Sequence, residues 1–313
     1  MGCDAVIRLE SDALSQTELD DQADAVHAVL EDVERTLSRF RSDSELSALN
    51  RDERPAVPAS ALVRRLAVAA RWAGRRSGGL VDATLVQDLV GLGYASSRDG
   101  IPPAPLDAAL AAAPPRRPAR PNLVRGYEHL TVDTRGRVLR PPGVPLDSGG
   151  LGKGLAVDLA AEGLPAGVRY AIGCGGDLAV GGSPELRWEV AVRDARSARE
   201  GHRLALPAGG VATSGIDARL WARPDGSYAH HLLDPATGAP AWTGVVAATA
   251  VADSALEAEV LAKTALLSGP AGARRVLYGR GGVIQHDSGR IEVVPALPVA
   301  VRLARGAVLR AAA

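Results

Sequence analysis

Residues 146–158 read Leu-Asp-Ser-Gly-Gly-Leu-Gly-Lys-Gly-Leu-Ala-Val-Asp, and the rest of the chain is organised around them. The pattern predicts a strand, a glycine turn and then a helix. Glycines let the backbone approach a ligand closely, and the free N–H groups at a helix start attract anions. Lys153 adds a positive charge. Two interpretations fit, a phosphate site or a tight packing turn, and the spacing matches neither the dinucleotide-binding nor the P-loop pattern.

A second stretch, residues 230–238, reads His-His-Leu-Leu-Asp-Pro-Ala-Thr-Gly. A histidine with an ordinary pKa is a natural proton acceptor for a hydroxyl nucleophile, although a single histidine is more often structural. The chain has no Gly-x-Ser-x-Gly pattern, so a serine hydrolase is not indicated. The residues alone therefore predict an enzyme or a binding protein for a phosphate-bearing small molecule.

The composition is that of an ordinary globular chain. Of 313 residues, 46% are hydrophobic and 23% are charged, with no net charge. Neither nucleic acid nor a membrane surface is indicated as a partner, and no apolar run has the length of a membrane span. The absence of a secretory signal pattern predicts a cytoplasmic location. Cys3 and Cys174 are far apart in sequence, and two small buried side chains are a simpler interpretation than a disulfide.

Hydrophobic periodicity predicts a series of helices and strands, and the length allows one or two domains. A strand at Ala5–Glu10 precedes a helix that Thr17 caps, and Ser60 opens a further helix. Ser254 and Glu257 form a capping box for a helix that ends at Gly269-Pro270. The remaining predictions are a surface insertion rich in Pro and Ala at 101–121 with a short helix at 106–113, hairpins at 131–139 and around 287–289, and a buried strand at 245–251.

Further motifs follow one another in a specific order. Residues 37–50 read Leu-Ser-Arg-Phe-Arg-Ser-Asp-Ser-Glu-Leu-Ser-Ala-Leu-Asn, and residues 77–84 read Ser-Gly-Gly-Leu-Val-Asp-Ala-Thr. Gly-Gly-Asp at 175–177 and Ser-Gly at 214–215 lie between the two stretches quoted above. Each motif is weak alone. Together and in this order they resemble the ApbE family, the FAD:protein FMN transferases, of which the chain looks like a divergent member.

The resemblance implies an α+β, T-fold-like architecture with antiparallel sheets and packed helices, in which residues 1–313 form a single domain. It implies that FAD and Mg²⁺ bind and that FMN moves to a Thr or Ser hydroxyl of a partner flavoprotein, with release of AMP. His231 would be the base. Family members are often exported. By position, FAD would be bound by Met1, Phe40, Leu80, Val81, Asp82, Asp147, Gly149, Lys153 and Leu232.

Two of these positions have other interpretations from the residues alone. Phe40, the only phenylalanine, is either a core anchor or a flat wall for a ring ligand. Asp82 follows a glycine pair, and taken alone it is better explained as a cap of the next helix than as a ligand-binding residue. Val81 and Ala83 stand where the family has Phe and Pro, which predicts a looser flavin pocket.

The metal positions depart from the family. The implied ligands are the Gly152 carbonyl and two helix side chains, Asp and Thr in the family but Glu259 and Lys263 here. Glutamate binds hard cations, whereas a charged lysine has no lone pair. Either an altered Mg²⁺ site persists with help from Asp253, Glu257 or Thr264, or the Lys263 ammonium occupies the place of the ion. The alternative functions are an FAD pyrophosphatase and a non-catalytic FAD-binding protein in which Lys263 replaces the metal.

Overall fold

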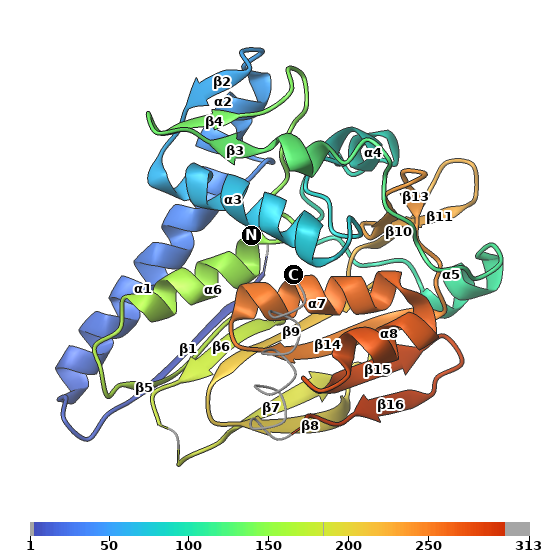
Figure 1. Cartoon of the computed structure of the whole chain (residues 1–313). Coiled ribbons are helices and arrows are strands. Elements are labelled where there is room, and N and C mark those ends of the chain that lie inside the picture. The colour runs from blue at the N-terminus through green and yellow to red at the C-terminus, as the bar shows by residue number, and fades with distance from the viewer. Residues whose placement is uncertain (1–2, 184, 298–313) are drawn as a thin grey trace, which may run out of the picture.

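Seven antiparallel strands form the main sheet in a computed structural model that describes residues 3–183 and 185–297. The strand order is β1-β5-β6-β9-β14-β15-β16, so both ends of the described chain contribute to the sheet (Figure 1). β14, the predicted buried strand, lies inside the sheet between β9 and β15. The bounds are β1 Ala5–Glu10, β5 Arg169–Cys174, β6 Asp177–Gly181, β9 Gly209–Gly215, β14 Val245–Ala252, β15 Gly282–His286 and β16 Ile291–Val294.

Alternating side chains place different layers on the two faces of this sheet. Ile172 and Ala179 point into the core under the helices, whereas their neighbours Ala171 and Val180 pack on Trp188 of a separate hairpin. The helices are α1 Gln16–Leu37, α6 Gly152–Glu162, α7 Ala255–Leu267 and α8 Gly269–Leu277 (Figure 1), and the hairpin is β7 Trp188–Arg193 with β8 Glu200–Leu206. The predicted α+β architecture of antiparallel sheet and packed helices is confirmed.

Helix α7 is the central helix of the molecule, because 11 of its 13 residues are buried. It packs on β9 and β14 below and contacts α6 and α8 at its sides. Ser254 caps it by accepting a hydrogen bond from the Glu257 amide, as predicted. The Glu257 carboxylate does not complete the capping box and instead forms an ion pair with Arg280. A helix buried on nearly all sides presents every side chain to a neighbour, so charged residues on it need partners inside the protein.

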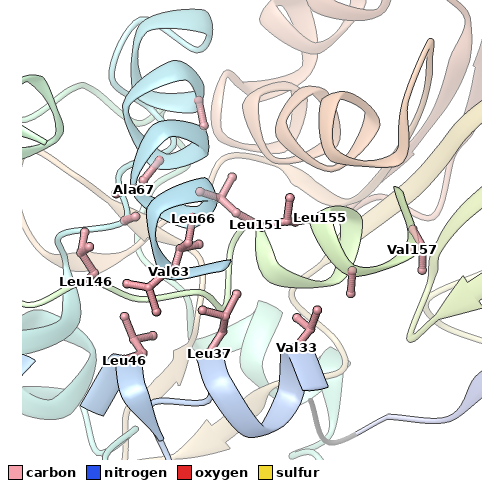
Figure 2. Packing of buried hydrophobic residues seen from close by; sticks show 14 of the residues in the cluster. Val33, Leu37, Leu46, Val63, Leu66, Ala67, Leu146, Leu151, Leu155 and Val157 are labelled. Carbon is pink, nitrogen blue, oxygen red and sulfur yellow. The ribbon is translucent and has the colours of Figure 1, made fainter. Parts of the chain in front are cut away.

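The segment between α1 and α6 forms a second layer above these helices. Figure 2 shows Leu37 and Leu46 facing Val63 and Leu66, with Leu155 of α6 beside them. A small sheet in the order β2-β4-β3 completes the layer. The elements of this second layer are α2 Glu45–Arg51, β2 Ala56–Pro58, α3 Ala61–Arg76, α4 Val86–Gly91, a 3₁₀ turn Gly126–His129, β3 Thr131–Val132 and β4 Arg137–Leu139.

The Pro- and Ala-rich segment 101–121 runs along the side of the molecule and includes α5 Leu106–Ala112. Backbone hydrogen bonds attach it: the Ala119 amide donates to the Leu267 carbonyl at 2.8 Å and the Arg117 amide to the Trp242 carbonyl at 3.1 Å. Nearby lie β10 Leu220–Ala222, β11 Tyr228–His230, β12 Leu233–Asp234 and β13 Ala239–Pro240. Among the described residues, no helix has both the length and the apolar character to cross a bilayer.

Several local predictions are wrong. Ser15, not Thr17, caps α1, in a capping box with Glu18. No strand precedes the glycine turn, because Asn50 makes hydrogen bonds to both the Leu146 amide and the Leu146 carbonyl, each at 2.8 Å. The Gly269-Pro270 pair ends α7 but also starts α8, which the sequence reading missed.

Candidate functional site

A pocket opens where the glycine turn, α7 and the second organising stretch meet. It brings together many residues that are far apart in the sequence and that the motifs singled out. Those that line it are Leu80, Val81, Asp82, Asp147, Gly149, His231, Leu232 and Lys263. Met1 lies outside the described residues.

The glycine turn is held rigidly at the edge of this pocket. Ser148 donates a hydrogen bond from Oγ to the Leu37 carbonyl at 2.6 Å, and the Asp147 amide donates to the Ala83 carbonyl at 2.8 Å. Asp147 also pairs with Arg39, at 3.1 Å. The following glycine, Gly149, donates its amide to the Asp147 carboxylate at 3.1 Å. The turn therefore presents a fixed backbone surface to a ligand.

Asp82 is half-buried in the opposite wall and is not a helix cap. Its carboxylate accepts hydrogen bonds from the Thr84 amide at 2.9 Å and the Thr84 hydroxyl at 2.6 Å. Helix α4 begins only at Val86, without a side-chain cap. Burial raises the pKa of Asp82 although Thr84 favours the charged form. The carboxyl group is thus oriented by Thr84 at the surface of the pocket.

Two lysines and two carboxylates form a buried cluster below the glycine turn. Lys263 Nζ lies 2.8 Å from Glu259 Oε1, and Lys153 Nζ lies 2.9 Å from Asp177 Oδ2. Glu259 is fully buried, and its Oε2 accepts the Gly154 amide of the first turn of α6 at 2.9 Å. Although burial alone would raise it, Lys263 and Lys153 hold the pKa of Glu259 below its usual value.

This cluster corrects the expected position of Lys153. Its ammonium faces Asp177 rather than the pocket, and one N-terminal amide of α6 faces Glu259. Burial disfavours the charged form of Lys153, yet Asp177 and Glu259 raise its pKa. Burial, with the nearby Glu259 charge, raises the pKa of Asp177. Neither Lys153 nor Gly152 lines the pocket, so the cation that does is Lys263.

The two adjacent histidines have different surroundings. His230 is fully buried at the end of β11, where its ring meets Trp242 edge-on at 4.8 Å and accepts the Leu232 amide. His231 lines the pocket. Burial lowers the pKa of His231 well below its usual value, and His230 and Lys263 lower it further. His231 is therefore neutral at physiological pH, which is the form that accepts a proton.

The comparisons with known proteins agree with the motif order. A model described as the ApbE family matches residues 1–284. The chain belongs to this family. A Vibrio cholerae ApbE relative named FAD:protein FMN transferase is 30% identical over 267 residues, which cover 81% of this chain and 73% of that protein. A Klebsiella pneumoniae protein with the same name is 30% identical over 272 residues, covering 82% and 73%.

Solved ApbE structures share the fold. The ApbE protein of Thermotoga maritima superposes with a TM-score of 0.76 at 24% identity and covers 96% of both chains. The flavinyl transferase ApbE of Pseudomonas stutzeri in its apo form gives 0.69 at 24% identity and covers 93% of this chain and 94% of its own.

The residues at the metal positions of the ApbE motifs do not fit a divalent ion. Both Glu259 oxygens already accept a hydrogen bond, and the protonated Lys263 cannot be a ligand. The neighbours considered as substitutes are turned elsewhere: Thr264 donates to the Val260 carbonyl at 2.7 Å, whereas Asp253 and Glu257 pair with Arg280. Within residues 3–183 and 185–297, no group of three or more His, Cys, Asp or Glu side chains is arranged to hold a metal.

An aromatic rim beside the pocket was only partly anticipated. Phe40 is 38% exposed rather than a core anchor, and its ring centroid lies 5.4 Å from that of Tyr94, a pocket residue. Tyr94 in turn lies 5.6 Å from Trp221. The Arg39 guanidinium sits 4.1 Å from the Phe40 ring centroid. The signal for Tyr94 was available, because only 3% of the residues are aromatic and it follows a glycine-rich segment.

The two cysteines are close in space although distant in sequence. Both are free thiols, with the sulfur atoms 3.2 Å apart, and only Cys174 is buried. Cys3 lies just before β1, which pairs with β5, the strand that ends at Cys174. The expectation of two small buried side chains therefore holds for Cys174 and is wrong for Cys3.

Proposed function

We propose that this chain transfers the FMN part of FAD to a Thr or Ser hydroxyl of a partner flavoprotein and releases AMP. Membership of the ApbE family and relatives named FAD:protein FMN transferase support the reaction class. One observation carries the assignment to this pocket: a neutral histidine and a buried ammonium line the same cavity.

The pocket residues have distinct parts in this reaction. His231 accepts the proton of the acceptor hydroxyl as its oxygen bonds to the FMN phosphorus. The bond from that phosphorus to the bridging oxygen breaks, and AMP leaves with the electron pair. The bound diphosphate is negatively charged, so it raises the pKa of His231 and makes the imidazole a better base than in the free protein. The rim of Phe40 and Tyr94 offers faces on which the flavin ring stacks.

Substitution of His231 tests the proposal. The wild-type chain, FAD and a peptide with a Thr or Ser acceptor site should give a peptide heavier by FMN less water, detected by mass spectrometry. His231→Asn should lower the transfer rate by about a hundredfold or more, the usual contribution of a general base, while flavin fluorescence shows that FAD still binds.

A distant histidine provides the control. His286, on β15, pairs with Glu292 at 3.1 Å and does not line the pocket. His286→Gln should transfer FMN at the wild-type rate. Transfer by His231→Asn at that same rate would contradict the assigned base. Release of free FMN without any labelled peptide would instead indicate the pyrophosphatase.

One observation favours a second candidate, a non-catalytic FAD-binding protein. The Lys263–Glu259 pair occupies positions that the ApbE motifs assign to metal ligands. Tight FAD binding with neither labelled peptide nor free FMN would support this candidate over a transferase.

A further inference from the structure

We propose that the Lys263 ammonium is a built-in cation that binds the diphosphate of FAD, so that this chain binds FAD without a divalent metal ion. The inference rests on the proposed function for its ligand, and it replaces the expectation of a Mg²⁺ site. It makes Lys263 a binding residue of the pocket.

The first step is the position of the ammonium. Lys263 is only 7% exposed, yet it lines the pocket. Its stem passes beside the glycine turn, where a Cβ built on Gly150 would lie 3.6 Å from Lys263 Cε. The backbone of the turn at Gly150 and the lysine stem therefore lie side by side. A ligand phosphate that contacts the turn also comes close to the ammonium.

The second step is the hydrogen-bonding capacity of the ammonium. An ammonium has three N–H donors. Among the described residues, Glu259 accepts one of them, at 2.8 Å. The pairing with a fully buried carboxylate fixes the ammonium in place. The donors that Glu259 does not use are available to phosphate oxygens.

The third step is the charge balance. Lys153 and Lys263 already neutralise Asp177 and Glu259 within the cluster. A divalent cation bound to Glu259 would lie beside the Lys263 ammonium and be repelled by it. An incoming diphosphate, in contrast, is attracted by the same ammonium. The cluster as built therefore favours an anion in the pocket over a second cation.

The fourth step is the choice of residue type. Among the 36 lysines and arginines of the chain, only Lys153 and Lys263 are lysines, and both lie in this cluster. Everywhere else the chain uses arginine. An ammonium is a compact point charge, whereas a guanidinium is a wide planar fork. Lysine at these two positions puts compact charges into the buried cluster, and at Lys263 such a charge stands at a position that the family motifs assign to a metal ligand.

The test measures FAD binding directly. Purified full-length protein is freed of metal with EDTA, and FAD is titrated by flavin fluorescence with EDTA or with Mg²⁺ present. The dissociation constant should be the same in both. Lys263→Met keeps the apolar stem and removes the charge, and it should weaken FAD binding about tenfold to a hundredfold, the effect of losing one charge-assisted hydrogen bond. As a control for general charge, Arg203→Met on the exposed hairpin should leave FAD affinity unchanged.

A second measurement observes FAD binding in the wild-type protein without relying on activity, and it uses a variant only to assign a signal. With two lysines in the chain, a sample labelled with ¹⁵N at lysine Nζ gives two side-chain ammonium signals, and the one missing in Lys263→Met is that of Lys263. FAD in EDTA should shift this signal strongly. The double variant Glu259→Asp with Lys263→Thr, which restores the family ligands, should gain Mg²⁺ binding by calorimetry and need Mg²⁺ for FAD binding.

The outcomes separate this inference from the proposed function. If FAD binds wild type only with Mg²⁺, or binds in EDTA without moving the Lys263 signal, the built-in cation is refuted while FMN transfer stands. If FAD binds in EDTA and shifts Lys263 but no FMN reaches an acceptor peptide, the cation is supported and the transferase is refuted. If FAD binds under neither condition, both fail.

Discussion

At the scale of single residues, the thiol of Cys3 is expected to be unusually acidic. Its hydrogen bond with Cys174, together with the nearby Lys153 ammonium, lowers the pKa of Cys3 to about 6, although burial opposes the shift. Because the thiolate is the reactive form, alkylation of Cys3 by iodoacetamide should rise with pH around a midpoint near 6 and level off above neutral pH. Peptide mapping across a pH series measures this.

The control for Cys3 is its partner. Cys174→Ala removes the largest cause of the shift, so the midpoint of Cys3 alkylation should move toward the usual thiol range. A midpoint that stays near 6 in this variant would show that the thiol pair is not the cause.

The sequence motifs predicted many of the residues that line the pocket, but they did not predict which charged side chains form ion pairs. His231, Asp82 and Lys263 were expected from motifs, and all three line it. That Lys153 would face Asp177 could not be foreseen, because their contact spans 24 residues and depends on how the hairpin of β5 and β6 docks on α6. Arg39 lies within the 37–50 motif, but its pairing with Asp147 depends on a contact between distant segments and could not be read from the motif.

At the scale of elements, the close approach of α6 and α7 depends on Gly154. A Cβ there would meet backbone atoms of α7, 2.7 Å from Leu256 Cα and 2.8 Å from the Ala255 carbonyl oxygen. Backbone atoms cannot move aside cheaply, so Gly154→Ala should destabilise the fold by about 1–3 kcal/mol, the usual effect of overpacking. Denaturant unfolding followed by circular dichroism measures the change.

A second glycine of the same helix is the matched control. At Gly163, the C-cap of α6 with φ −81°, a Cβ would have only the Ala160 carbonyl oxygen nearby, at 3.6 Å. Gly163→Ala should therefore keep wild-type stability within about 0.5 kcal/mol. Equal unfolding midpoints for the two variants would mean that the α6–α7 contact is looser than described.

The sequence predicted helices and strands well where their own residues decide the conformation. The helix over 16–37 and the strand over 5–10 have clear periodicity, and both are found. Errors arose where a distant residue decides the conformation. Asn50 holds Leu146 out of any strand, and Gly269, with φ +68°, turns the chain so that Pro270 can start a new helix immediately. A proline after a helix usually marks the end of that helix, so Pro270 was interpreted only as the end of α7 and the start of α8 was missed.

At the scale of the whole molecule, the family motifs predicted the antiparallel arrangement of the sheet, which hydrophobic periodicity cannot predict. Periodicity names helices and strands but not their partners in a sheet, and in the order β1-β5-β6-β9-β14-β15-β16 strand β1 pairs with β5, which lies far along the chain. The antiparallel architecture was expected only through the resemblance. The hairpin β7–β8 on the far face, and the attachment of residues 101–121 to Leu267 and Trp242, are tertiary features that no local pattern contains.

The contacts between distant parts of the chain predict how the molecule unfolds and how FAD affects it. The sheet joins strands from both ends of the described chain, and the pocket takes walls from Leu80–Leu89, from the glycine turn and from α7. Thermal unfolding should therefore be one transition, as expected of a single domain. FAD binds the folded state and should raise the midpoint by several degrees, since ligand at a hundredfold its dissociation constant adds about 2.7 kcal/mol. Calorimetry in EDTA measures both effects. Two transitions of which FAD moves only one would show that the pocket does not join the two halves, because a ligand held by both must stabilise them together.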